Sequence, residues 1–172
     1  MNKAVIALGT NMGDRIGNLN LALRAISRLP NVRIVAGSKV YETDPVGITD
    51  QNKFYNAVVL VETGVSPLNL LGSCLGIEAA MGRIRTVKNG ARIIDLDLLL
   101  YENFKCETSE LTLPHSRMLE RAFVLRPLSD IFPGDRALGL LYSPYLKELD
   151  DAGIQVTDYE LIIPEQENYY DM

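Results

Sequence analysis

The chain has 172 residues, of which 47 % are hydrophobic, and a formal net charge of −5 at pH 7. This length predicts one domain, and the ordinary hydrophobic fraction excludes an intrinsically disordered or fibrous protein. General nucleic-acid binding needs an extensive basic face, so we expect no nucleic-acid partner. Cys74 and Cys106 are the two cysteines, and we expect free thiols in a reducing compartment. No apolar run has membrane-spanning or signal-peptide length, which predicts a cytoplasmic protein without a membrane partner.

Apolar periodicity predicts four strands and two helices before residue 102. The strands are expected over 4–8, 32–41, 54–62 and 93–101. The first helix is expected over 19–29 and is ended by Pro30, and the second runs from an N-cap at Ser66 to Met81. This β-α-β-β-α-β order indicates an α+β fold of the ferredoxin-like kind, an antiparallel sheet with helices on one face. Further short helices are expected over 116–128 and 142–149.

Residues 82–101 combine cations with two carboxylates in an otherwise apolar run. The carboxylates, Asp95 and Asp97, are two residues apart on an expected strand, so they emerge on one face roughly 6.5 Å apart. Neighbouring acids at the edge of a core repel each other and lose hydration, which favours a divalent metal such as Mg²⁺ between them. The cations just ahead of them are Arg83, Arg85, Lys88 and Arg92. Metal-holding acids beside phosphate-holding cations indicate a nucleotide phosphate site.

Other interpretations of these residues stay open. The two aspartates would also be stable on a solvent-facing side of the strand or paired with arginines. Neither glycine-rich phosphate loop, G-x-G-x-x-G or G-x-x-x-x-G-K-[ST], occurs, so the turn after Gly9 is interpreted as a plain strand-to-helix connection. Asn56 lies in an apolar strand, where its amide either pairs with nearby backbone or contacts a ligand.

Four segments together resemble the 6-hydroxymethyl-7,8-dihydropterin pyrophosphokinase family of folate biosynthesis. They are ALGTNMGD, YETDPVG with FYNAVV, IEAAMGRIR with GARIIDLDLLLY, and LTLPHSRMLERAFVLRPL. The likeness covers about residues 3–130 of a single domain over 1–172; we assign no role to the extension 131–172. The resemblance implies a ferredoxin-like enzyme that transfers the pyrophosphoryl group of ATP to the pterin hydroxymethyl group, leaving AMP. It therefore implies ATP and a pterin as small-molecule partners of a protein that we expect to be a monomer.

The resemblance also implies roles for individual residues. Two Mg²⁺ ions are expected on Asp95 and Asp97, with Arg83 and Arg92 as further catalytic residues. It also implies that the nucleotide is bound by Glu78, Arg85, Leu98, Leu111, Thr112, His115 and Arg121. For the pterin it implies Thr43, Pro45, Val46, Gly47, Phe54, Asn56 and Phe123, with the two aromatic rings stacking on the flat bicycle and Asn56 contacting its nitrogens.

The chain departs from the family pattern at three positions. Asn89 and Ala91 replace a usual Trp and Pro, which predicts weaker closure of that loop, and Leu75 replaces a glutamine found near adenine in some members. Two other functions are considered beside the enzyme. One is a non-catalytic sensor of a nucleotide or pterin, and the other is a metal-dependent phosphohydrolase that uses the same pair of aspartates.

Overall fold

The computed structural model describes residues 1–47, 50–82 and 90–166. In chain order the elements are β1 (Asn2–Thr10), α1 (Arg15–Ser27), β2 (Val32–Gly37), β3 (Tyr41–Thr43), β4 (Phe54–Thr63), α2 (Pro67–Ala80), β5 (Asp95–Tyr101), β6 (Cys106–Glu107), β7 (Thr112–Leu113), the 3-10 helix η1 (Met118–Glu120), α3 (Ala122–Ile131), β8 (Arg136–Ala137), β9 (Leu140–Leu141), α4 (Ser143–Glu148) and β10 (Ile154–Val156).

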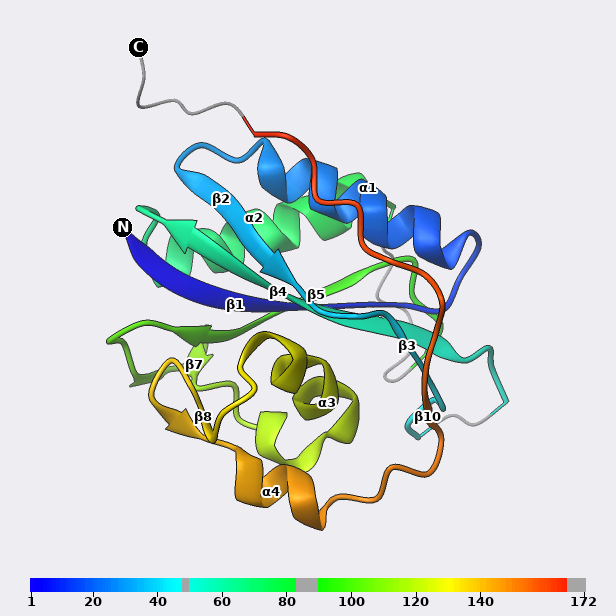
Figure 1. Cartoon of the computed structure of the whole chain (residues 1–172). Helices are drawn as coiled ribbons and strands as arrows, with labels where there is room; N and C mark the ends of the chain where they lie inside the picture. The colour runs from blue at the N-terminus through cyan, green and yellow to red at the C-terminus, as the bar shows by residue number, and fades with distance from the viewer. Residues whose placement is uncertain (48–49, 83–89, 167–172) are drawn as a thin grey trace.

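The main sheet has the strand order β10-β3-β4-β1-β5, with β2 also paired to β4, and every pairing is antiparallel. Helices α1 and α2 lie together on one face (Figure 1). The predicted α+β fold class is therefore confirmed. The Ser66 side chain accepts a hydrogen bond from Asn69 N at the start of α2, which confirms the predicted N-cap.

Two predicted elements are each divided in the structure. The strand expected over 32–41 becomes β2 and β3, because Ser38 intervenes and binds β4 through its backbone N–H and its hydroxyl, which contact Val58. The helix expected over 116–128 becomes η1 and α3, because Arg121 between them has extended backbone (φ −116°, ψ 104°). These divisions place Thr43 and Phe123 at the ends of short elements rather than within long ones.

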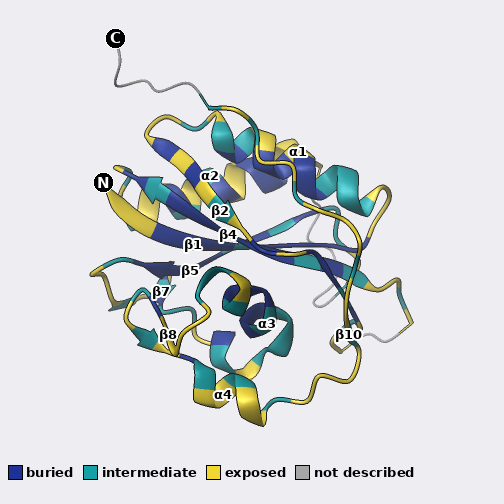
Figure 2. Cartoon of the chain, viewed as in Figure 1, coloured by how far each residue is buried: buried dark blue, intermediate teal, exposed yellow. Residues whose placement is uncertain are grey.

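Apolar side chains are buried on both faces of the sheet, whose central strands are largely coloured as buried in Figure 2. Under α1 and α2 the core includes Ile6, Leu8, Leu23, Leu70 and Leu98. On the opposite face α3 packs through Leu125 and Leu128 against Val5, Val58 and Leu99. Each such buried side chain contributes about 1.5–3 kcal/mol of transfer free energy. The pattern predicted helices on one face only, and the segment after β5 covers the other.

The chain after α4, to which the sequence alone assigns no role, contributes to the fold. β10 pairs with β3, and the following residues run past the edge of the sheet and over α1 (Figure 1). There Leu161 packs against the core, and Ile162 N donates a 2.9 Å hydrogen bond to Asn20 Oδ1. Buried contacts and backbone pairing order this segment against the rest of the molecule.

Two further predictions concern the cysteines and the membrane. Cys74 and Cys106 are both free, as predicted, and burial raises the pKa of the Cys74 thiol to about 12, with smaller contributions from Glu78 and Asp97. Such a thiol is not reactive at neutral pH. None of the helices in the described part of the chain has both the length and the apolar character needed to span a bilayer.

Candidate active site

A cleft of about 750 Å³ lies on the α3 side of the sheet. Its floor is formed by the ends of β1, β3, β4 and β5, and its walls are formed by residues 115–124 and 149–154. Eleven predicted site residues line it: Thr43, Pro45, Val46, Phe54, Asn56, Arg92, Asp95, Asp97, His115, Arg121 and Phe123. Segments far apart in the sequence therefore meet in one cavity of ligand-binding size.

Asp95 and Asp97 emerge on the cleft face of β5, as the two-residue period predicted. Leu96 and Leu98 alternate with them and are buried under the helices on the other face. In the register with β1, Asp95 lies opposite Gly9 and Asp97 opposite Ala7. An ion pair joins Arg92 Nη1 to Asp95 Oδ2 at 3.6 Å. Both carboxylates line the cleft and are partly exposed to it, so a cation in the cleft can reach them.

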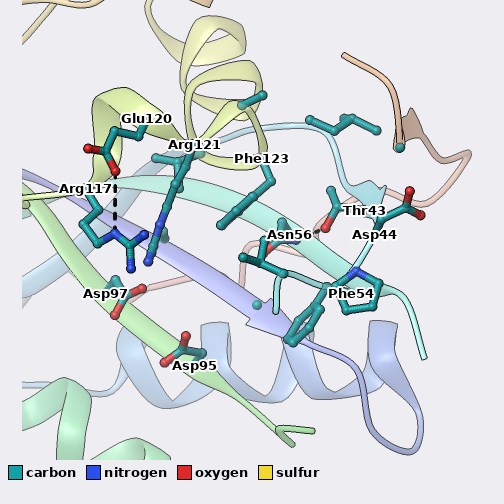
Figure 3. A pocket seen from close by; sticks show the side chains of 18 of the residues that line it. Thr43, Asp44, Phe54, Asn56, Asp95, Asp97, Arg117, Glu120, Arg121 and Phe123 are labelled. Carbon is teal, nitrogen blue, oxygen red and sulfur yellow. Dashed lines mark hydrogen bonds and ion pairs between the residues drawn. The ribbon is translucent and has the colours of Figure 1, made fainter. Parts of the chain in front are cut away.

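Cationic side chains from the segment after β7 face the aspartates. Arg117 and Arg121 flank η1, and their guanidinium groups reach toward Asp97, with Arg117 also paired to Glu120 (Figure 3). Burial lowers the pKa of Arg121, as does neighbouring Arg117, while Asp97 and Asp95 raise it. Since the ordinary pKa of an arginine lies far above neutral, Arg121 stays charged at neutral pH. This end of the cleft therefore presents acids and cations to one ligand.

His115 lies in the wall formed by residues 115–124, and hydrogen bonds of its backbone and its ring fix its position. Its N–H donates to Leu99 O at 2.8 Å, and its Nδ1 accepts a 3.3 Å hydrogen bond from Arg117 N. Burial lowers the pKa of His115, with a further contribution from Arg121, while Asp95 acts in the opposite direction. A neutral imidazole at neutral pH follows, with its second nitrogen available as a hydrogen-bond donor.

The other end of the cleft combines two aromatic rings with an amide. Phe54 begins β4 and Phe123 lies in the first turn of α3, so their rings flank the cleft with Asn56 between them (Figure 3). Asn56 Nδ2 donates a 2.6 Å hydrogen bond to Thr43 Oγ1, and Thr43 is buried. The amide thus pairs locally and also lines the cavity. Two rings and one oriented amide suit a flat heterocycle.

Gly9 lines the cleft and Asn11 supports it from outside the lining, and the sequence indicated neither of them. Asn11 is buried, and its Oδ1 accepts a 2.7 Å hydrogen bond from Arg92 N. Its Nδ2 donates to Gln51 Oε1 and Asn52 O at 2.9 and 3.0 Å. The turn after Gly9, interpreted above as a plain connection, therefore ties together the segments that carry Arg92 and Phe54. The only local signal was a polar residue directly after an apolar strand.

Several predicted residues within the described ranges do not line the cleft: Gly47, Glu78, Leu98, Leu111 and Thr112. Glu78 lies outside the lining because α2 covers the other face of the sheet, and its nucleotide contact remains a prediction. The Glu78 side chain is buried there and accepts a 3.2 Å hydrogen bond from Leu96 N. Leu98 and Leu111 belong to the core on that same face. The calls on Arg83, Arg85, Lys88 and Asn89 lie outside the described residues.

The two carboxylates of Asp95 and Asp97 fit Mg²⁺, which takes few protein ligands, better than they fit a metal whose ligands all come from the protein. Within the described ranges, no group of three or more His, Cys, Asp or Glu side chains is arranged to hold a metal ion. Asp95 and Asp97 supply two hard oxygen ligands beside the cations of the same cleft. Mg²⁺ is commonly bound through one or two carboxylates and completes its shell with water and substrate phosphates. The pair therefore fits Mg²⁺ that arrives with a polyphosphate.

Comparisons with known proteins agree with this geometry. The sequence model of the family described as 7,8-dihydro-6-hydroxymethylpterin-pyrophosphokinase (HPPK) matches residues 5–133. A Methylorubrum extorquens 2-amino-4-hydroxy-6-hydroxymethyldihydropteridine pyrophosphokinase is 43 % identical over 155 residues, covering 90 % of this chain and 98 % of its own. The Bacillus subtilis enzyme of that name is 45 % identical over 130 residues, covering 76 % and 78 %.

The fold also matches solved structures. A crystal structure of wild-type Plasmodium falciparum HPPK-DHPS with pteroate superposes with a TM-score of 0.68 at 20 % identity. The match covers 86 % of this chain and 42 % of that chain. At this identity the similarity establishes the fold and no more.

Proposed function

Since the chain belongs to the 7,8-dihydro-6-hydroxymethylpterin-pyrophosphokinase family, we propose that the cleft beside Asp95 and Asp97 is where it carries out the family reaction. The enzyme transfers the pyrophosphoryl group of ATP to the hydroxymethyl group of 6-hydroxymethyl-7,8-dihydropterin, a step of folate synthesis that releases AMP. One observation carries the proposal. A charged end with two carboxylates and an aromatic end with an oriented amide open into the same cavity.

The charged end would hold the triphosphate. Asp95 and Asp97 would bind two Mg²⁺ ions together with phosphate oxygens, and those ions supply neutralisation of the phosphate charge. Arg92 and Arg121 would donate to phosphate oxygens, and their loss is expected to lower turnover about 10³-fold by analogy with arginine fingers. Arg83 and Arg85 remain proposed phosphate contacts on the resemblance alone.

The aromatic end would hold the pterin. Phe54 and Phe123 would lie against the two faces of the bicycle, and Asn56 would contact its ring nitrogens. The hydrogen bond to Thr43 supports this role because it fixes the orientation of the amide before a ligand arrives. Pro45 and Val46, which line the same end, would cover the edge of the ring. Gly47 remains a proposed pterin contact on the resemblance alone.

The two ends would align the reacting atoms in line. The hydroxymethyl oxygen forms a bond to the β-phosphorus and loses its proton, while the bond from that phosphorus to the oxygen bridging it to the α-phosphorus breaks. The electron pair leaves with that oxygen on AMP. Positioning and charge stabilisation account for most of such catalysis, so the protein needs no covalent intermediate.

His115 would donate a hydrogen bond to a phosphate or to the nucleoside from its wall beside Arg121, since its imidazole is neutral. Glu78, Leu98, Leu111 and Thr112 remain proposed nucleotide contacts, supported only by the resemblance. A single domain over 1–172, a monomeric state, a cytoplasmic location and the absence of a nucleic-acid partner likewise remain predictions.

An assay with defined products tests the proposal. The metal-free protein is mixed with ATP and 6-hydroxymethyl-7,8-dihydropterin, and Mg²⁺ is added back while AMP and the pterin diphosphate are quantified. We expect both products to appear together and only with the metal. Binding without turnover would instead indicate a sensor, and nucleotide cleavage that proceeds equally without pterin would indicate a phosphohydrolase.

A further inference from the structure

The segment Leu149–Ile154 lines the cleft although it lies outside the part of the chain that matches the family, residues 5–133. Leu149, Asp150, Ala152, Gly153 and Ile154 all contribute to the wall. We call this segment the C-terminal wall. It faces the aromatic end of the cavity, because its contacts are with the elements that carry Thr43 and Phe123.

On one side the C-terminal wall is fixed to the strand and loop that carry Thr43. Asp44 N donates a 2.9 Å hydrogen bond to Gly153 O, and the backbone register places Ile154 opposite Thr43. Just beyond, Thr157 donates from both its N–H and its hydroxyl to Val40 O at 2.9 Å. Edge pairing of this kind restrains β3 and the start of the loop after it.

On the other side the C-terminal wall is fixed to the helix that carries Phe123. Arg126, one turn further along α3, forms an ion pair with Asp151. The wall therefore spans from α3 to β3, the two elements on either side of the aromatic end. Asp95 and Asp97 lie on β5, at the far edge of the sheet from β10.

Gly153 makes the close approach to Asp44 possible. Its φ is +80°, a conformation that disfavours any side chain. A Cβ at this position would lie 2.3 Å from Asp44 Oδ2, 2.8 Å from Cγ and 3.3 Å from Cβ. Asp44 follows Thr43 in the chain, and Thr43 accepts the hydrogen bond from the Asn56 amide. A displacement of Asp44 is therefore transmitted through Thr43 to Asn56, the proposed pterin contact.

We propose that the C-terminal wall is a specificity element for the pterin, with Gly153 as a positioning residue that acts through Asp44 and Thr43 on Asn56. The inference rests on the proposed function of the cleft. By pre-organising the aromatic end, the wall lowers the cost of ordering it when the pterin binds. It acts on the pterin and not on the nucleotide, because its fixed contacts lie at one end of the cavity.

A pair of matched glycine variants tests the inference. Gly153→Ala introduces the Cβ beside Asp44. Gly139→Ala is the control, because Gly139 has φ +87° and nothing within 4 Å of its Cβ position, so it carries the backbone strain without the contact. Binding of 6-hydroxymethylpterin and of a non-hydrolysable ATP analogue is measured by calorimetry on the full chain, and KM and kcat are measured for each substrate.

For Gly153→Ala we expect pterin affinity to fall about 5- to 30-fold, the factor that corresponds to one or two kcal/mol. The pterin KM should rise accordingly, while the affinity for the ATP analogue stays unchanged. Gly139→Ala should match the native protein for both ligands. Adding Asp44→Gly to Gly153→Ala removes the carboxyl that the new Cβ meets, so the double variant should bind the pterin more tightly than Gly153→Ala.

Three results would overturn the inference. They are equal pterin affinity in the two alanine variants, an equal loss of affinity for the pterin and the ATP analogue in Gly153→Ala, or a double variant that binds the pterin no more tightly than Gly153→Ala. If Gly153→Ala does not fold, Asp151→Asn weakens the link to Arg126 from an exposed position, and it must lower pterin affinity selectively. A native protein that neither binds nor converts the pterin refutes the proposed function instead, so the two failures are distinguishable.

Discussion

Gly9 leaves room for the amide of Asn56. The two residues are paired across β1 and β4, and a Cβ at Gly9 would lie 2.8 Å from Asn56 Oδ1. Real Cβ atoms do not approach this closely, so the amide must shift. Because Gly9 also lies opposite Asp95 in the register with β5, one glycine separates the two ends of the cleft.

Gly9→Ala is therefore expected to displace Asn56 and weaken pterin binding. Overpacking of this kind costs about 1–3 kcal/mol, which corresponds to roughly 5- to 150-fold in affinity. Calorimetry with 6-hydroxymethylpterin measures the change. Gly72→Ala serves as the control, because Gly72 lies exposed in α2 with nothing within 4 Å of its Cβ position. That variant should bind normally and gain up to about 1 kcal/mol in stability. Unaltered pterin binding by Gly9→Ala would contradict the role of Asn56.

Asp97→Ala is expected to fold normally and to lose most turnover. Removing one of two neighbouring carboxylates relieves their repulsion but leaves the phosphates without half of their metal site. We expect kcat to fall by about 10³-fold or more, measured as AMP formation at saturating Mg²⁺. Glu107→Gln, which neutralises an exposed carboxylate on β6, should retain the native rate. Asp97→Ala with the native rate would remove the basis of the metal assignment.

Local patterns in the sequence predicted a large part of the fold and of the charged end. The alternation of Leu96 and Leu98 with Asp95 and Asp97 determines which face each side chain takes, and this period is visible within seven residues. Ser66 likewise caps a helix through a contact three residues away. Such features need no knowledge of the rest of the chain.

Features that depend on distant contacts were not predictable in this way. Asn11 meets the backbone of Arg92 across 81 residues, and Gly153 meets Asp44 from outside the family-like region. The buried contact of Glu78 with Leu96 N was not predictable either, because the helix pattern does not say which side of the sheet α2 covers. A polar residue after a strand predicts a turn, whereas its partners become known only from the packing.

Asn11→Ala tests whether that turn supports catalysis. The variant removes three hydrogen bonds at a buried position, and we expect a stability loss of about 2–3 kcal/mol in urea unfolding. It also removes the side-chain bond to Arg92 N and leaves Arg92 held through the bond from Asn11 N to Arg92 O, so kcat should fall about 10- to 100-fold as the guanidinium shifts from the phosphates.

Asn20→Ala is the matched control for this prediction. Asn20 is also buried, but its side chain accepts a hydrogen bond from Ile162 N on the side of the sheet away from the cleft. This variant should lose stability and keep kcat. If both variants keep the native kcat, Asn11 has only a structural role.

His115 gives a pH dependence whose sign follows from its surroundings. Burial and Arg121 lower its pKa below the ordinary value of 6.5, so the unfolded chain takes up the proton first as pH falls. The resulting stability is fully present above pH 6.5 and is lost as pH falls through the folded-state pKa. The free energy of unfolding, measured in urea, should therefore fall more between pH 7.5 and pH 5.5 for the native chain than for His115→Gln, which lacks the titrating group.

The same group can be followed directly, because the chain has a single histidine. An NMR titration of the imidazole should give a midpoint below 6.5 in the free protein. Binding of a non-hydrolysable ATP analogue brings negative charge beside His115 and should raise that midpoint. A midpoint that the nucleotide leaves unchanged, while calorimetry shows binding, would place the phosphates elsewhere in the cleft. His115 would then be a structural residue of the wall, held by its hydrogen bonds with Leu99 O, Arg117 N and Met118 N.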